Sequence, residues 1–229
     1  MDAQAETAPP LDLTRIDVIS DAICPWCYIG KRQLERALAE LAGDALSFNV
    51  HWNPFQLNPD MPPEGRDRLG YRIEKFGSAE RAAELDARIT ETAAGVGLEF
   101  HLERLSRTPN TVAAHRTILL AGAAGVQDAV VEALMRGYFC EGADIGDSAT
   151  LAALADGAGL PGDAVRDMLA GDEGLEIVLR GDAMARRAGI SGVPSFALAG
   201  HVLFSGAYPA EQMVANFIRA RQMLASRAA

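Results

Sequence analysis

Two of the three cysteines in the chain, Cys24 and Cys27, lie three positions apart in a C-x-x-C motif. The motif follows an apolar segment and precedes an amphipathic one. Residues three apart on a helix lie on the same face, so the two sulfurs can form a short disulfide or remain a dithiol. This spacing indicates thiol–disulfide chemistry, and half of a zinc site is the alternative.

The placement of the motif distinguishes the two cysteines. Cys24 falls at the N-cap or first position of the expected helix, where unpaired backbone N–H groups and the helix dipole stabilise a thiolate. Pro25 suits the first helical turn because its missing N–H has no partner there. We therefore expect Cys24 to be the nucleophile and Cys27, one turn inside, to be the resolving thiol.

The zinc alternative lacks the ligands that it needs. A structural zinc site takes four ligands, which usually occur in closely spaced pairs. Neither Cys140 nor the four histidines show such spacing. We expect no metal, and we interpret Cys140 as a small residue buried at a helix end.

Composition limits the partners and the compartment. The chain has 229 residues, 49% of them hydrophobic, and a formal net charge of −10 without any basic run. This balance argues against nucleic acid and anionic membrane surfaces, and it disfavours acidic partners. Residues 1–15 lack the pattern of a signal peptide, and no apolar run reaches the roughly 18 residues of a membrane span. We therefore expect a cytoplasmic protein.

Periodicity predicts the order of the elements. A buried strand at 16–19, a helix ending at Gly43 and an alternating strand over 46–52 form a β-α-β unit. A proline-rich loop over 53–63 cannot hold a regular helix, and helical patterns without a convincing strand follow it up to 171. A helix from 172 to 189, a hairpin of 195–198 with 202–205, and a last helix opening at Pro209 complete the chain. We expect a disordered tail at 1–15, one domain made of 16–53 and 172–226, and a helical insertion domain at 54–171.

This order, with C-x-x-C at the first strand-to-helix turn, resembles the thioredoxin fold, and the helical insertion resembles the DsbA-type branch. Several motifs are similar to the FrnE-like subgroup: Cys24–Lys31, Trp52–Pro59, Asn110 with Ala114-His115-Arg116, Tyr138-Phe139 with Glu141-Gly142 and Asp144-Ile145, and Gly192–Phe196. The resemblance implies an α/β thioredoxin fold with a large all-helical insertion and the activity of a thiol–disulfide oxidoreductase.

The resemblance also implies a cis peptide bond between Val193 and Pro194, facing Cys24. Cis bonds are essentially confined to X-Pro, and this proline lies between Gly192 and a strand, where a tight bend is needed. The Val193 backbone would then be free to pair with an extended substrate.

The remaining site residues have alternative interpretations. Trp26 is expected to form an apolar rim around Cys24, whereas Phe55 and Leu57 either join this rim or belong to the core. Asn110 caps a helix or lines the substrate groove. His115 is a hydrogen-bonded structural histidine, or else a ligand or a base. Asp21 assists proton transfer from Cys27 or caps the helix. The expected substrate-binding residues are Val193, Pro194, Pro25, Trp26, Phe55, Leu57, Asn110 and His115.

Two activities follow from the resemblance. The first exchanges disulfides with a protein or peptide through a redox-active Cys24–Cys27 disulfide and needs no cofactor. The second is that of kappa-class glutathione transferases and 2-hydroxychromene-2-carboxylate isomerases, which use glutathione as co-substrate. Those relatives have a serine where Cys24 stands, so retention of both cysteines favours the redox activity.

Overall fold

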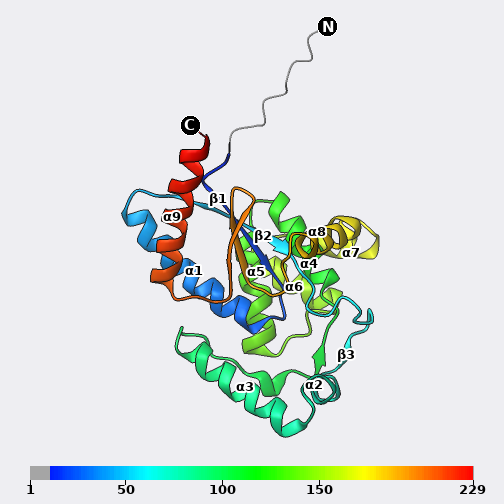
Figure 1. Ribbon diagram of the computed structural model, residues 1–229. Helices are drawn as coiled ribbons and strands as arrows, with labels where there is room; N and C mark the ends of the chain where they lie inside the picture. Colours follow the sequence, from blue (N-terminus) through cyan, green and yellow to red (C-terminus); the bar gives the residue numbers. More distant parts are fainter. Residues whose placement is uncertain (1–10, 229) are drawn as a thin grey trace.

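A four-stranded mixed sheet forms the centre of the protein (Figure 1), which is described here by a computed structural model covering residues 11–228. The strand order is β2-β1-β5-β6, with β1 and β2 parallel and the other neighbours antiparallel. The strands are β1 (Arg15–Ser20), β2 (Asn49–Pro54), β5 (Ser195–Leu198) and β6 (His201–Ser205). The predicted β-α-β start and the C-terminal hairpin are both confirmed.

Helices cover both faces of this sheet. On one face, α1 (Pro25–Gly43) packs against α9 (Ala210–Ala228). On the other, α8 (Leu175–Arg187) contacts β2. The alternation of side chains along β1 accounts for the two layers: Val18 belongs to the main core, whereas Ile19 packs in a separate cluster with Ala185 of α8.

The segment between β2 and α8 consists mainly of helices joined by loops, as predicted. No helix within residues 11–228 has the length and the apolar character needed to cross a bilayer. The elements of the insertion are α2 (Arg68–Phe76), α3 (Ala79–Ala94), a 3-10 turn (Leu102–Arg104), α4 (Val112–Ala123), α5 (Gln127–Arg136), a π-helical turn (Gly137–Glu141), α6 (Ser148–Gly157) and α7 (Gly162–Ala170).

The structure corrects two predictions about strands. β2 begins at Asn49 rather than at 46, because the Leu46 N–H donates to Leu41 O at 2.9 Å in the turn that ends α1. Phe48 instead packs against Phe217 of α9, with 6.0 Å between the ring centroids. The insertion also contains a small antiparallel pair, β3 (Arg66–Asp67) and β4 (Arg107–Thr108), which is too short to leave an alternating pattern.

The predicted disordered tail lies mostly outside the described residues, which begin at Leu11. Within them, the Asp12 carboxylate accepts a hydrogen bond of 2.9 Å from Thr14 N–H, and β1 begins at Arg15.

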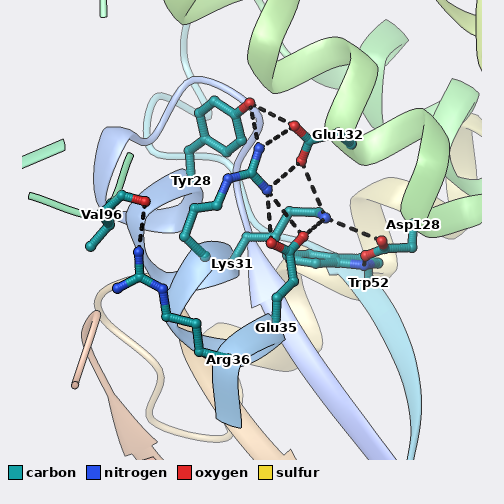
Figure 2. Close-up of polar contacts among 9 residues, drawn as sticks. Tyr28, Lys31, Glu35, Arg36, Trp52, Val96, Asp128 and Glu132 are labelled. Atoms are coloured by element: carbon teal, nitrogen blue, oxygen red, sulfur yellow. Dashed lines mark hydrogen bonds and ion pairs between the residues drawn. The ribbon is translucent and has the colours of Figure 1, made fainter. Parts of the chain in front are cut away.

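A charged network joins α1 to α5 of the insertion (Figure 2). The Lys31 side chain is only 2% exposed and is paired with Asp128 at 3.1 Å, Glu132 at 3.2 Å and also Glu35. Glu132 accepts hydrogen bonds from Arg32 and, at 2.7 Å, from the Tyr28 hydroxyl.

This network also reaches β2, since the Trp52 indole N–H donates to Asp128 at 3.0 Å. A buried ammonium group requires such pairing, because removing one partner of a buried ion pair lowers the stability of the fold by about 3–5 kcal/mol. The network therefore fixes the helix that carries the C-x-x-C motif against the insertion.

We expect Glu132→Gln to reduce the stability of the fold by about 2 kcal/mol at neutral pH and to weaken its dependence on acid pH. Burial opposes ionisation of Glu132, but bonds from Arg32 and Tyr28 and the neighbouring cations outweigh it and lower its pKa to about 2. The carboxylate's contribution is therefore complete above its usual pKa near 4.5 and is lost as pH falls toward 2. Urea unfolding between pH 2 and 7 measures this loss.

Glu84→Gln is the matched control, because Glu84 is 63% exposed and its one ion-pair partner within residues 11–228 is the exposed Arg81. Its free energy of unfolding should equal that of the wild type across the pH range, since exposed ion pairs contribute little to stability. Equal free energies of unfolding for the two variants across this pH range would contradict the stabilising role of the network.

Candidate active site

Cys24 is the N-cap of α1 and directly follows the turn that leaves β1. Its backbone is extended, with φ −87° and ψ 113°, and Pro25 begins the helix. The Cys24 carbonyl accepts the Cys27 N–H at 3.0 Å, which closes the first turn. The sulfur thus lies where the helix dipole favours negative charge.

The loop before β5 faces this sulfur. The Val193–Pro194 peptide bond is cis, and the Cys24 thiol donates to Val193 O at 3.5 Å. Two further bonds hold the loop: Ser195 Oγ donates to Gly192 O at 2.8 Å, and Gly206 N–H donates to Pro194 O at 2.7 Å. The carbonyl of Val193 is therefore presented to Cys24 by an ordered turn.

Gly30 permits the close approach of α1 to this loop. A Cβ atom at Gly30 would lie 2.9 Å from Pro194 Cγ, which is closer than real Cβ atoms come to another heavy atom. The absence of a side chain at Gly30 therefore sets the distance between the helix that carries Cys24 and the loop that faces it.

Cys27 differs from Cys24 in its surroundings. It is fully buried, whereas Cys24 is 3% exposed and lines a cavity that Cys27 does not reach. Burial raises the pKa of the Cys27 thiol well above its usual range, and the adjacent Cys24 sulfur and the charge of Asp21 raise it further, against a backbone hydrogen bond at Asp21. Both cysteines are free thiols in this structure.

A buried polar pair lies beneath the motif. The Asp21 carboxylate is completely buried, accepts the Leu57 N–H at 2.8 Å and lies 3.5 Å from His115 Nε2. His115 Nε2 is also 3.1 Å from Phe55 O. Two acceptors around this nitrogen indicate that it carries a hydrogen. The N-cap residue of α1 is Cys24 rather than Asp21, and the Asp21 carboxylate accepts backbone hydrogen bonds from Leu57 and Ile23 instead.

A cavity of about 550 Å³ opens beside Cys24. One wall comes from the motif and the facing loop, and the other comes from α2 and α3, the two teal helices at the lower edge of Figure 1. This volume lies within the range of small-molecule sites. Its wall on the motif side consists of Ile23, Cys24, Pro25, Trp26, Gly192 and Val193.

The structure brings together only part of the predicted substrate-binding set. Pro25, Trp26, Leu57 and Val193 line the cavity, and Trp26 is 46% exposed there. Pro194 is in the loop that faces Cys24.

The other three predicted residues have structural partners outside the cavity lining. Phe55 is 2% exposed beneath the Arg186 guanidinium, 4.3 Å from its ring centroid. Asn110 donates to Met61 O at 2.7 Å and accepts the Val112 N–H at the start of α4. His115 is 3% exposed, and its Nε2 lies 3.1 Å from Phe55 O and 3.5 Å from an Asp21 carboxylate oxygen.

The cations of the second wall were not among the predicted site residues. Arg68, Arg72 and Lys75 of α2 and Arg88 of α3 line the cavity. The signal was present, because positions 68, 72 and 75 follow i, i+4, i+7 spacing and share one helical face. Within residues 11–228, no cluster of three or more His, Cys, Asp and Glu side chains is placed to hold a metal ion.

Residues 15–217 match the model of the DSBA-like thioredoxin domain. The protein therefore belongs to this family, and its fold is a thioredoxin fold with a helical insertion. The family comprises thiol–disulfide oxidoreductases and related isomerases.

Three solved structures are similar to the chain. A probable DsbA oxidoreductase from Streptomyces coelicolor is 31% identical, with 90% of this chain and 89% of the other covered and a TM-score of 0.80. The cytosolic disulfide reductase DsbM from Pseudomonas aeruginosa, solved with GSH, is 20% identical, with 93% of this chain and 98% of the other covered and a TM-score of 0.60. A 2-hydroxychromene-2-carboxylate isomerase is 15% identical, with 94% of this chain and 100% of the other covered and a TM-score of 0.63. The last two show a shared fold alone.

We expect Gly30→Ala to destabilise the protein by about 1–3 kcal/mol, because the added methyl group must displace the Pro194 ring. Gly43→Ala is the matched control in the same helix, since a Cβ at Gly43 meets nothing within 4 Å. Urea unfolding should show a lower free energy of unfolding for Gly30→Ala and an unchanged one for Gly43→Ala. Equal stability of both variants would contradict the close packing of α1 on the loop.

Proposed function

We propose that the protein is a thiol–disulfide oxidoreductase, FrnE-like within its family, with Cys24 as nucleophile and Cys27 as resolving thiol. The observation that carries this proposal is the different placement of the two sulfurs. Cys24 lies at the helix N-terminus, in the wall of the cavity and against Val193 O, whereas Cys27 is buried one turn behind it. A substrate disulfide entering the cavity meets Cys24 first.

The proposed reaction transfers two electrons in two exchanges. The Cys24 thiolate attacks one sulfur of a substrate disulfide, forms a mixed disulfide and releases the first substrate thiolate. Cys27 then loses its proton and attacks the Cys24 sulfur, which releases the second thiolate and leaves a Cys24–Cys27 disulfide. The substrate is reduced by two electrons and the dithiol is oxidised by two. The reverse sequence oxidises a substrate dithiol.

The cis-proline loop supports substrate binding in this proposal. Pro25, Trp26 and Leu57 supply apolar surface beside Cys24, while the Val193 carbonyl is a backbone acceptor for an extended substrate. In a reducing cytoplasm the dithiol form is populated, so we propose a reductase or isomerase direction.

A redox titration tests the proposal. The protein is equilibrated with defined mixtures of reduced and oxidised glutathione, and its tryptophan fluorescence, to which Trp26 contributes beside Trp52, reports the redox state. We expect one reversible two-electron transition with a midpoint between about −270 and −120 mV, the range of related dithiols. Cys24→Ser should abolish the transition.

The same preparation examines the second activity. A wild type that shows no transition but conjugates or isomerises a small electrophile with glutathione would contradict the redox proposal and support the glutathione-dependent class. Cys140→Ser is the control and should leave the transition in place, because Cys140 does not line the cavity.

We also propose that Asp21 accepts the proton that Cys27 must lose. Its carboxylate is completely buried, and its charge acts on the Cys27 thiol. Asp21→Asn keeps an acceptor for the Leu57 N–H but removes the base. When the reduced variant meets excess oxidised glutathione, we expect the mixed disulfide on Cys24 to resolve about 10²-fold more slowly, the lower range for a positioned base. Acid quenching with intact-mass analysis measures the mixed disulfide.

The opposite result is informative because Asp21 also raises the pKa of Cys27. If Asp21 acted only through its charge, its removal would increase the thiolate fraction of Cys27 and accelerate resolution. Asp17→Asn is the control within β1, since Asp17 pairs with Arg15 at 2.7 Å and accepts from Asn53. It should resolve the mixed disulfide at the wild-type rate.

A further inference from the structure

The cavity beside Cys24 has a cationic wall in a protein whose net charge is −10. In the part of the chain that the structure describes, four cationic side chains line it and one carboxylate does, that of Asp86. Because the protein as a whole repels anions, this local excess of positive charge needs an explanation from the site itself. The four cations are Arg68, Arg72 and Lys75 of α2 and Arg88 of α3.

Asp86 cannot neutralise this wall. It pairs with Arg68 at 2.7 Å and with Arg72 at 2.6 Å, so one carboxylate serves two guanidinium groups. Burial and the neighbouring Arg68 charge lower the pKa of Arg72, despite the attraction of Asp86. Among the described residues the Arg72 Nε atom is buried and has no hydrogen-bond partner. Arg72 Nη2 also donates to Ala82 O at 3.1 Å, so in the described part of the chain the charge of this guanidinium is compensated only by the carboxylate that it shares with Arg68.

The other two cations have no carboxylate partner among residues 11–228. Lys75 Nζ donates to the Tyr71 hydroxyl at 2.7 Å and to Asn58 Oδ1 at 3.3 Å, and both acceptors are neutral. Arg88 is exposed, and its side chain forms no ion pair with these residues. Two cations without a carboxylate partner and one guanidinium that shares its carboxylate with Arg68 therefore line the same cavity as Cys24.

We propose that this wall selects a low-molecular-weight disulfide that carries carboxylates. One sulfur of the substrate lies at Cys24, and its carboxylates pair with Arg72, Lys75 and Arg88. The cavity of about 550 Å³ holds a small molecule, and the guanidinium fork matches a carboxylate. This inference rests on the proposed function and assigns its substrate class. Each half of the substrate leaves as a free thiol, with the two electrons supplied by the Cys24–Cys27 dithiol.

Three disulfides of different charge test the proposal. The reduced protein is mixed with oxidised glutathione, which is anionic, with hydroxyethyl disulfide, which is neutral, and with cystamine, which is cationic. The rate of protein oxidation is followed for the wild type and for the double variant Lys75→Gln/Arg88→Gln. Each variant rate is compared with the wild-type rate for the same disulfide, because the three leaving thiols differ in reactivity.

We expect the double variant to react at least tenfold more slowly with oxidised glutathione, within twofold of the wild type with hydroxyethyl disulfide, and faster with cystamine. Arg81→Gln/Arg180→Gln is the matched control, because it removes the same charge from exposed helical positions outside the cavity. Its three rates should stay within twofold of the wild type. All four substituted side chains are exposed, so folding should be preserved.

Two outcomes would overturn the inference in distinguishable ways. If all three disulfides react through Cys24 but the double variant changes their rates equally or not at all, the substrate class is wrong and the redox function stands. If the wild type reduces none of the three disulfides, the proposed function fails together with the substrate class.

Discussion

The contact between the first turn of α1 and the cis-proline loop is the constraint on which the site depends. It places the Cys24 sulfur 3.5 Å from Val193 O and at the positive end of a helix. The approach requires glycine at position 30, where a Cβ would meet the Pro194 ring. The sheet positions both sides of this contact, because Cys24 lies in the turn that follows β1, and β5 begins directly after Pro194.

The helical insertion has two roles around this contact. Through Glu132 and Asp128 it holds Lys31 and Arg32, and so fixes the orientation of the helix that carries the two cysteines. Through α2 and α3 it closes the cavity beside Cys24 with positive charge. The contacts that hold the proposed nucleophile and the wall that we propose for substrate recognition thus belong to different parts of one insertion.

Features set by local spacing were predictable from the sequence. The C-x-x-C motif with Pro25 predicted the helix start, and the short Gly-containing turn predicted the hairpin of β5 and β6. Features that depend on tertiary contacts were not. The alternation at Leu46 and Phe48 is typical of a strand. In the structure, however, the Leu46 N–H bonds to Leu41 O at the end of α1, and Phe48 packs against Phe217 of α9. The partners of His115 come from segments 60 and 94 positions away, so spacing could not reveal them.

The most direct test of the account is to trap the first covalent intermediate in Cys27→Ser. This variant keeps the proposed nucleophile and cannot resolve a mixed disulfide. After brief exposure to oxidised glutathione, intact mass and peptide mapping should show one glutathione per chain, attached to Cys24. Attachment to Cys140 instead, or no attachment under conditions that oxidise the wild type, would contradict the assignment of Cys24 as the nucleophile.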